Sequence, residues 1–151
     1  MPGKNKKILA VASAGGHWVQ LLRLSPAFEG HRLEYLSTNS GYQADVAVPL
    51  HVVTDANIWE KKLLVKMFIE VAWVLIKYRP NIVITTGAAP GFAAIVLGRL
   101  LGARTVWIDS IANSEELSNS GKHARRFASA WVTQWQHLAR EKGPEYWGAV
   151  L

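Results

Sequence analysis

The sequence predicts an α/β protein built on a parallel sheet with helices on both faces. Strand-like and helix-like segments alternate along the 151 residues, and the strand-like segments are mostly short apolar runs. Two glycine-rich turns, SAGGH at 13–17 and TTGAAPG at 85–91, each lead from a strand-like segment into a helix-like one. This length suits one domain, which we expect to occupy residues 1–151.

The first half of the chain supplies three of the expected strands. Apolar runs predict them at 7–13, 32–38 and 51–54. A helix is expected over 17–25, with an apolar side made by Trp18, Leu21, Leu22 and Leu24. Residues 39–48 are compatible with a short helix. A long helix over 59–78 should stop before Pro80, because proline cannot continue a helix.

The second half continues the alternation. The β-branched segment NIVITT predicts a strand at 81–86, and the helix expected over 90–101 begins with Pro90, which suits a first turn. Two further strands, at 104–109 and 130–135, should flank a helix at 121–129. With strand order 3-2-1-4-5, the first and fourth strands are neighbours. Both glycine-rich turns then meet at the carboxyl edge of the sheet, where parallel sheets bind ligands.

The glycine-rich turns suggest an anion site. A helix N-terminus carries unpaired N–H groups and partial positive charge, and glycine lets a ligand approach the backbone. His17 would lie at the mouth of the first turn, where it could donate to a phosphate oxygen or accept a proton. The alternative is that both turns are ordinary connections and His17 is a cap or a surface residue. A glycine pair alone does not decide between these interpretations.

Several function classes are disfavoured. The dinucleotide fingerprint needs three spaced glycines and an acidic residue after the second strand, where this sequence has Ser37, Thr38 and Asn39. There is no GxxxxGK[ST] string, no GxSxG elbow, no convincing metal-ligand spacing and no cysteine. We therefore expect no cofactor and no metal. The net charge of +6 favours an anionic partner, but no nucleic-acid recognition motif is present.

The long helix has two possible roles. Only Lys66 and Glu70 interrupt LLVKMFIEVAWVLI, which is too short to span a bilayer, so the simplest interpretation is a core helix. The alternative is a helix lying on a membrane surface, because basic residues cluster at its ends. The membrane contacts would then be Trp59, Lys61, Lys62 and Trp73. The N-terminal segment MPGKNKK lacks the apolar region of a signal peptide, which favours a cytoplasmic location.

Four motifs, in order, resemble those of one known family. They are SAGGHWVQLLRL, TTGAAPGFAAIVLGRLLGA, WIDSIANSEELSNSGK, and TQWQHLA followed by YWGAVL. Over residues 7–151 the chain resembles the bacterial PssD-type polysaccharide biosynthesis proteins. These are related to the acceptor-side, membrane-recruiting subunit (Alg family) of the two-chain UDP-N-acetylglucosamine transferase of the dolichol pathway. The resemblance implies a Rossmann-like domain equivalent to the N-terminal half of a GT-B glycosyltransferase, such as the one-chain MurG-type enzymes.

The resemblance also implies roles for individual residues. The glycine-glycine-histidine turn is implicated in holding the acceptor diphosphate, and the second turn and an acidic-serine pair lie at the same edge. The acidic residue is Asp here, where eukaryotic relatives usually have Glu. The expected diphosphate ligands are Ser13, Gly15, Gly16, His17, Thr86, Gly87, Gly91 and Ser110. His17 and Asp109 are the candidate general bases, and His17 is favoured because histidine changes charge near neutral pH.

The implied function is the acceptor half of a split glycosyltransferase. This chain would bind a polyprenyl-diphosphate-linked sugar, and a donor-binding partner chain would bring a UDP-sugar for transfer with inversion. Eukaryotic members carry an N-terminal membrane anchor, and we expect none in this chain. We therefore expect peripheral attachment at the inner face of the cell membrane. The alternatives are a non-catalytic scaffold that recruits a complete transferase and, more distantly, a self-contained flavodoxin-like nucleotide- or flavin-binding protein.

Overall fold

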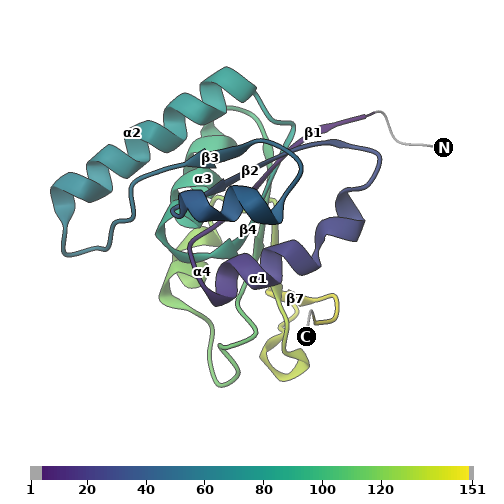
Figure 1. Ribbon diagram of the computed structural model, residues 1–151. Coiled ribbons are helices and arrows are strands. Elements are labelled where there is room, and N and C mark those ends of the chain that lie inside the picture. Colours follow the sequence, from purple (N-terminus) through teal and green to yellow (C-terminus); the bar gives the residue numbers. More distant parts are fainter. Residues whose placement is uncertain (1–4, 150–151) are drawn as a thin grey trace.

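A computed structural model describes residues 5–149 and contains one seven-stranded sheet (Figure 1). The strand order is β3-β2-β1-β4-β5-β6-β7, and every neighbouring pair is parallel. The expected order is therefore confirmed, with β1 and β4 paired at the centre. The strands are β1 (Lys7–Ala12), β2 (Arg32–Ser37), β3 (Leu50–Val52), β4 (Ile82–Gly87), β5 (Arg104–Ile108), β6 (Ala130–Thr133) and β7 (Glu145–Tyr146).

Helices cover both faces of this sheet. Figure 1 shows α1 and α2 on opposite faces, with the N-terminal end of α2 projecting beyond the strands. The helices are α1 (Gly16–Arg23), α2 (Lys61–Tyr78), α3 (Ala88–Leu100) and α4 (Asn119–Ala124). Short 3-10 helices connect the elements: η1 (Ser25–Phe28), η2 (Ser40–Asp45) and η3 (Gln136–Leu138).

The structure corrects several of the expected boundaries, most of them by one or two residues. The helix expected over 121–129 starts earlier, because the Ser118 side chain accepts from the N–H of Gly121 and caps α4 at Asn119. It also ends earlier, because Thr105 in β5 donates its hydroxyl to the carbonyl oxygen of Phe127 as the chain turns toward β6. The long helix begins at Lys61 rather than at 59. Strand β7 was not expected, since two residues are too few to give a periodic pattern.

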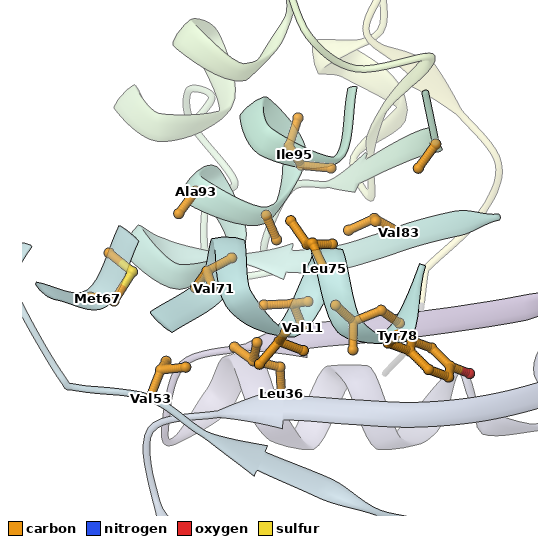
Figure 2. Close-up of a cluster of buried hydrophobic side chains, with 14 of the residues drawn as sticks. Val11, Leu36, Val53, Met67, Val71, Leu75, Tyr78, Val83, Ala93 and Ile95 are labelled. Carbon is orange, nitrogen blue, oxygen red and sulfur yellow. The ribbon is translucent and has the colours of Figure 1, made fainter. Parts of the chain in front are cut away.

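Each face of the sheet has its own core. In β1, Leu9 and Val11 face α2 and α3, whereas Ile8, Ala10 and Ala12 face α1. Figure 2 shows side chains of α2, α3 and the strands meeting in the first of these clusters. Burying one such aliphatic side chain stabilises the fold by roughly 1.5–3 kcal/mol, so β1 is secured from both sides.

Helix α2 is apolar on two opposite sides. Its inner side, which includes Met67, Val71 and Leu75, is buried in the core. Its outer side is exposed along a ridge of Val65, Ile69, Trp73 and Ile76, each between 57% and 64% exposed. Within residues 5–149, no helix is long and apolar enough to cross a membrane.

Candidate functional site

A cavity of about 260 Å³ opens at the carboxyl edge of the sheet, where β1, β4 and β5 end. It lies beside the first turns of α1 and α3 and the segment 109–120. Eight of its eleven lining residues have polar side chains, and the other three are one glycine and two alanines. The lining residues are His17, Thr86, Gly87, Ala88, Asp109, Ser110, Ala112, Asn113, Ser118, Asn119 and Ser120.

His17, in the first turn of α1, is held by the end of β4. Its Nδ1 lies 2.9 Å from the carbonyl oxygen of Thr86, and the Thr86 hydroxyl donates to the carbonyl oxygen of His17 at 2.6 Å. A carbonyl oxygen can only accept, so Nδ1 must carry the proton in this contact. In the neutral ring Nε2 is then the basic nitrogen, and it is left for a bound molecule.

Gly87 makes room for this histidine. Its φ is +133°, and a Cβ at this position would lie 2.8 Å from Cε1 and 2.9 Å from Nδ1 of His17. The next residue, Ala88, adopts a left-handed φ of 67° although it has a side chain. The turn after β4 therefore concentrates unusual backbone geometry beside the imidazole, which is typical of functional sites.

The turn after β1 is held by Tyr42 on one side and is open toward the solvent at Gly16. The N–H of Gly15 donates to the Tyr42 hydroxyl at 2.9 Å, and the Tyr42 ring stacks on Trp18 at 4.6 Å between centroids. No atom lies within 4 Å of the position that a Cβ on Gly16 would take. Neither α1 nor α3 has a side-chain cap at its first turn, so their leading N–H groups remain available to an anion.

Asp109 is buried and fully engaged. It is 2% exposed, and its carboxylate accepts from Trp107 Nε1, from Asn113 Nδ2 and from both the hydroxyl and the N–H of Ser118. A Cβ on Gly121 would lie 2.6 Å from Asp109 Oδ1, which explains the glycine at that position. The carboxylate therefore anchors the 110–118 loop against β5, and these contacts leave it poorly placed to accept a substrate proton.

A buried polar network connects the cavity to the sheet. Ser110 Oγ accepts from Gln20 Nε2 at 3.0 Å, and Gln134 Nε2 donates to Gln20 Oε1 at 2.7 Å and to the Asp109 carbonyl oxygen at 3.0 Å. The network joins α1, the end of β5 and the residue after β6. Sequence reasoning missed Gln20, Gln134, Asn113 and Ser118. The only signal for them was that all four lie within the motifs of the family resemblance.

The structure brings together five of the expected site residues. The cavity wall contains His17, Thr86, Gly87, Asp109 and Ser110.

The remaining expected ligands do not line this cavity. Ser13 and Gly15 lie in the turn between β1 and α1, and Gly16 is the first residue of α1. Gly91 is buried within α3, and a Cβ there would lie 2.1 Å from Thr85 Oγ1, so this glycine lets α3 approach β4 closely.

The four expected membrane contacts lie elsewhere, on α2 and in the loop before it. Trp59 is 84% exposed and Trp73 is 61% exposed, and both Lys61 and Lys62 are exposed. Across residues 5–149, no cluster of three or more acidic or histidine side chains is arranged to hold a metal ion.

Sequence comparison identifies the family. Residues 53–150 match the family described as oligosaccharide biosynthesis protein Alg14 like. This chain belongs to the Alg14-like family. It is 35% identical over 81 residues to the UDP-N-acetylglucosamine transferase subunit ALG14 of Eremothecium gossypii. That alignment covers 48% of this chain and 35% of the relative, so the chain matches about a third of that protein's length.

Solved structures show the same fold at low sequence identity. MurG of Acinetobacter baumannii superimposes with a TM-score of 0.76 and 15% identity, covering 93% of this chain and 44% of that one. The UDP-N-acetylglucosamine 2-epimerase of Rickettsia bellii gives a TM-score of 0.69 with 13% identity, covering 88% of this chain and 40% of that one. The expected Rossmann-like, GT-B-type fold and the Alg-family relation are confirmed, whereas the PssD-type assignment stays a prediction.

Two glycine substitutions distinguish a glycine that the fold requires from one that a ligand would require. Gly16→Ala should change the free energy of unfolding by no more than about 1 kcal/mol, because the space is open and alanine favours a helix. Gly87→Ala should cost about 1–3 kcal/mol, because it combines a disfavoured φ with a contact on His17. Urea unfolding measures both changes, and titration with pyrophosphate should show weaker binding for Gly16→Ala. Unchanged pyrophosphate affinity would mean that no anion approaches this turn.

Proposed function

We propose that this chain is the acceptor-side subunit of a two-chain glycosyltransferase. It would hold a polyprenyl-diphosphate-linked sugar at the membrane, and a partner chain would supply the UDP-sugar. The observation that carries the proposal is the polar cavity at the central β1/β4 edge, with His17 oriented by Thr86. Membership of the Alg14-like family supports it, as does a relative that is named as a transferase subunit.

The acceptor diphosphate would lie against the first turns of α1 and α3. Their uncapped N–H groups supply hydrogen-bond donors and the positive ends of two helix dipoles. The open position at Gly16 lets a phosphate oxygen reach the backbone. The polar wall beyond, which includes Asn113, Asn119 and Ser120, would receive the hydroxyl groups of the acceptor sugar.

His17 would act as the general base. Its Nε2 would take the proton from the attacking hydroxyl as that oxygen bonds to the anomeric carbon of the donor sugar. The bond from the anomeric carbon to the UDP oxygen breaks at the same time, UDP leaves with the electron pair, and the configuration inverts. The Nδ1 contact to Thr86 would stabilise the imidazolium that forms. Asp109 would act as a positioning residue, since its carboxylate contacts join the 110–118 loop to Trp107 of β5.

The outer ridge of α2 would attach the subunit to the inner face of the cell membrane. An exposed apolar ridge flanked by lysines matches the composition of a helix that lies in a lipid interface. Lys61 and Lys62 at its start and Lys77 in its last turn would meet anionic headgroups. Peripheral attachment would bring the cavity close to a lipid-linked acceptor.

The catalytic role of His17 is tested by transfer of labelled sugar from a UDP-sugar to a short-chain polyprenyl-diphosphate acceptor, using the chain with its partner. His17→Ala should lower turnover by roughly 10²-fold or more while the fold and the partner complex remain intact. His123→Ala is the matched control, because His123 is exposed on α4, away from the cavity. Wild-type turnover in His17→Ala would exclude His17 as the general base and would favour the non-catalytic scaffold.

The membrane role of the ridge is tested by sedimentation with lipid vesicles. The double variant Ile69→Ser, Trp73→Ser should lower partitioning into vesicles at least tenfold, because it removes two side chains whose apolar surface would enter the interface. The control, Val19→Ser with Trp147→Ser, removes exposed apolar side chains outside α2. Equal partitioning of the two double variants would mean that membrane contact occurs elsewhere.

A further inference from the structure

A second polar cavity lies at the amino-terminal end of the sheet. It has a volume of about 230 Å³, and its walls include Lys7, Arg32, Glu34, His51, Lys77 and Tyr78. Lys7 and Arg32 are the first residues of β1 and β2, whereas the His17 cavity lies where β1 and β4 end. The two cavities therefore occupy opposite edges of the sheet, and this one is separate from the proposed acceptor site.

Three cations in this cavity form no ion pair with an acidic residue of the described chain, residues 5–149. Lys7 Nζ and the Arg32 guanidinium lie 5.8 and 5.9 Å from the centre of the Tyr78 ring, and Lys77 belongs to the same wall. The one carboxylate, Glu34, lies 2.6 Å from His51 Nε2. Neither of the two ion pairs found within residues 5–149 involves Lys7, Arg32 or Lys77. The cavity thus has an excess of positive charge suited to an anion.

Tyr78 keeps this arrangement in place. Its ring is 7% exposed, and its hydroxyl donates to the carbonyl oxygen of Arg32 at 3.0 Å. Burial, with the nearby Glu34 carboxylate, raises the pKa of Tyr78 to about 12, so the hydroxyl stays protonated as a donor at neutral pH. Lys7 Nζ also donates to the Tyr78 carbonyl oxygen at 3.3 Å. Lys7 and Arg32 are therefore gathered around a buried, neutral ring.

An apolar groove continues from the cavity along α2. It has a volume of about 450 Å³, and its walls include Leu50 and Val52 of β3 and Ile69 and Trp73 of α2. His51 and Val74 line both the groove and the basic cavity, so the two are contiguous. Glu70, at the groove wall, is engaged by the N–H and the hydroxyl of Thr54.

The basic cavity and the apolar groove together form one slot. This slot also adjoins the ridge of α2. Ile69 and Trp73 belong both to the groove and to the exposed ridge, and Lys77 Nζ lies 4.6 Å from the centre of the Trp73 ring. A positive cavity that opens beside an apolar groove matches the two parts of a phospholipid, an anionic phosphodiester and an acyl chain.

We propose that this slot binds one anionic glycerophospholipid. Lys7, Arg32 and Lys77 would contact the phosphodiester, and one acyl chain would lie between β3 and α2. The proposal rests on the membrane attachment proposed above and adds a headgroup preference to it. Bound lipid would anchor the subunit without occupying the catalytic edge of the sheet.

Vesicle sedimentation tests this slot with two variants of equal charge. Arg32→Gln with Lys77→Gln removes two cations from the slot, and Lys61→Gln with Lys62→Gln removes two from the other end of α2. Vesicles of phosphatidylcholine, alone or mixed with phosphatidylglycerol, report headgroup preference. On the mixed vesicles the slot variant should lose about tenfold more affinity than its control, because it loses charged hydrogen bonds as well as general attraction. On phosphatidylcholine alone the two variants should be equal.

Glu34→Gln provides a test in which binding should increase rather than decrease. It removes the only carboxylate in the cavity wall, so binding to the mixed vesicles should become several-fold tighter. Native mass spectrometry should find one bound phosphatidylglycerol on the wild type and none on Arg32→Gln, Lys77→Gln. Equal losses in the two charge-matched variants would overturn the slot while leaving the membrane role of the ridge standing. If the wild type bound neither vesicle, both proposals would fail.

Competition with inorganic phosphate distinguishes a lipid site from a site for free phosphate. Phosphate should release the protein from mixed vesicles no better than chloride at equal ionic strength, because it lacks the chain that would fill the groove. Selective release by phosphate would mean that the three cations bind a soluble anion, which would overturn the lipid assignment.

Discussion

Two hydrogen bonds between His17 and Thr86 join the turns that follow β1 and β4, and the geometry of the cavity depends on them. One bond orients the imidazole and selects its basic nitrogen, and the other ties the backbone at the start of α1 to β4. The bond from the imidazole requires the ring to lie against Gly87, where any side chain would displace it. The parallel pairing of β1 with β4 supplies the frame, because it brings two strand ends and two helix N-termini to one point.

A second constraint shapes the opposite wall of the cavity. Asp109 accepts from three side chains and one backbone N–H and so secures the loop that carries Asn113 and Ser118. The glutamines at 20 and 134 tie this wall to α1 and to the end of β6. The cavity is therefore rigid and polar on the sheet side, while the outer ridge of α2 remains exposed. A cavity with fixed side chains at one edge of the sheet and an exposed apolar surface on α2 suit the proposed transferase subunit, which would bind a lipid-linked acceptor.

The sequence allowed much of this arrangement to be predicted. The strand order assumed from the general properties of parallel sheets is confirmed, and the two turns meet as expected. His17 lies in the cavity wall, while its role stays a prediction. The network around Asp109 could not be predicted, because its donors approach from residues whose contacts exist only after folding. Gly91 resembled a ligand position in the sequence, but its lack of a side chain serves helix packing. The apolar sequence of α2 did not reveal which of its sides would face the core, since both are apolar.

The proposed function requires an anionic acceptor to bind at the edge formed by His17, Thr86 and the first turn of α1. The most direct test is an NMR titration of this chain with a short-chain polyprenyl diphosphate, following the histidine ring nitrogens and the backbone amides. If the acceptor binds there, His17 Nε2 and the amides of Gly16 and His17 should shift together and saturate, while His31 and His123 remain unchanged. Saturable shifts confined to residues away from this edge, or none at the highest ligand concentration, would contradict it.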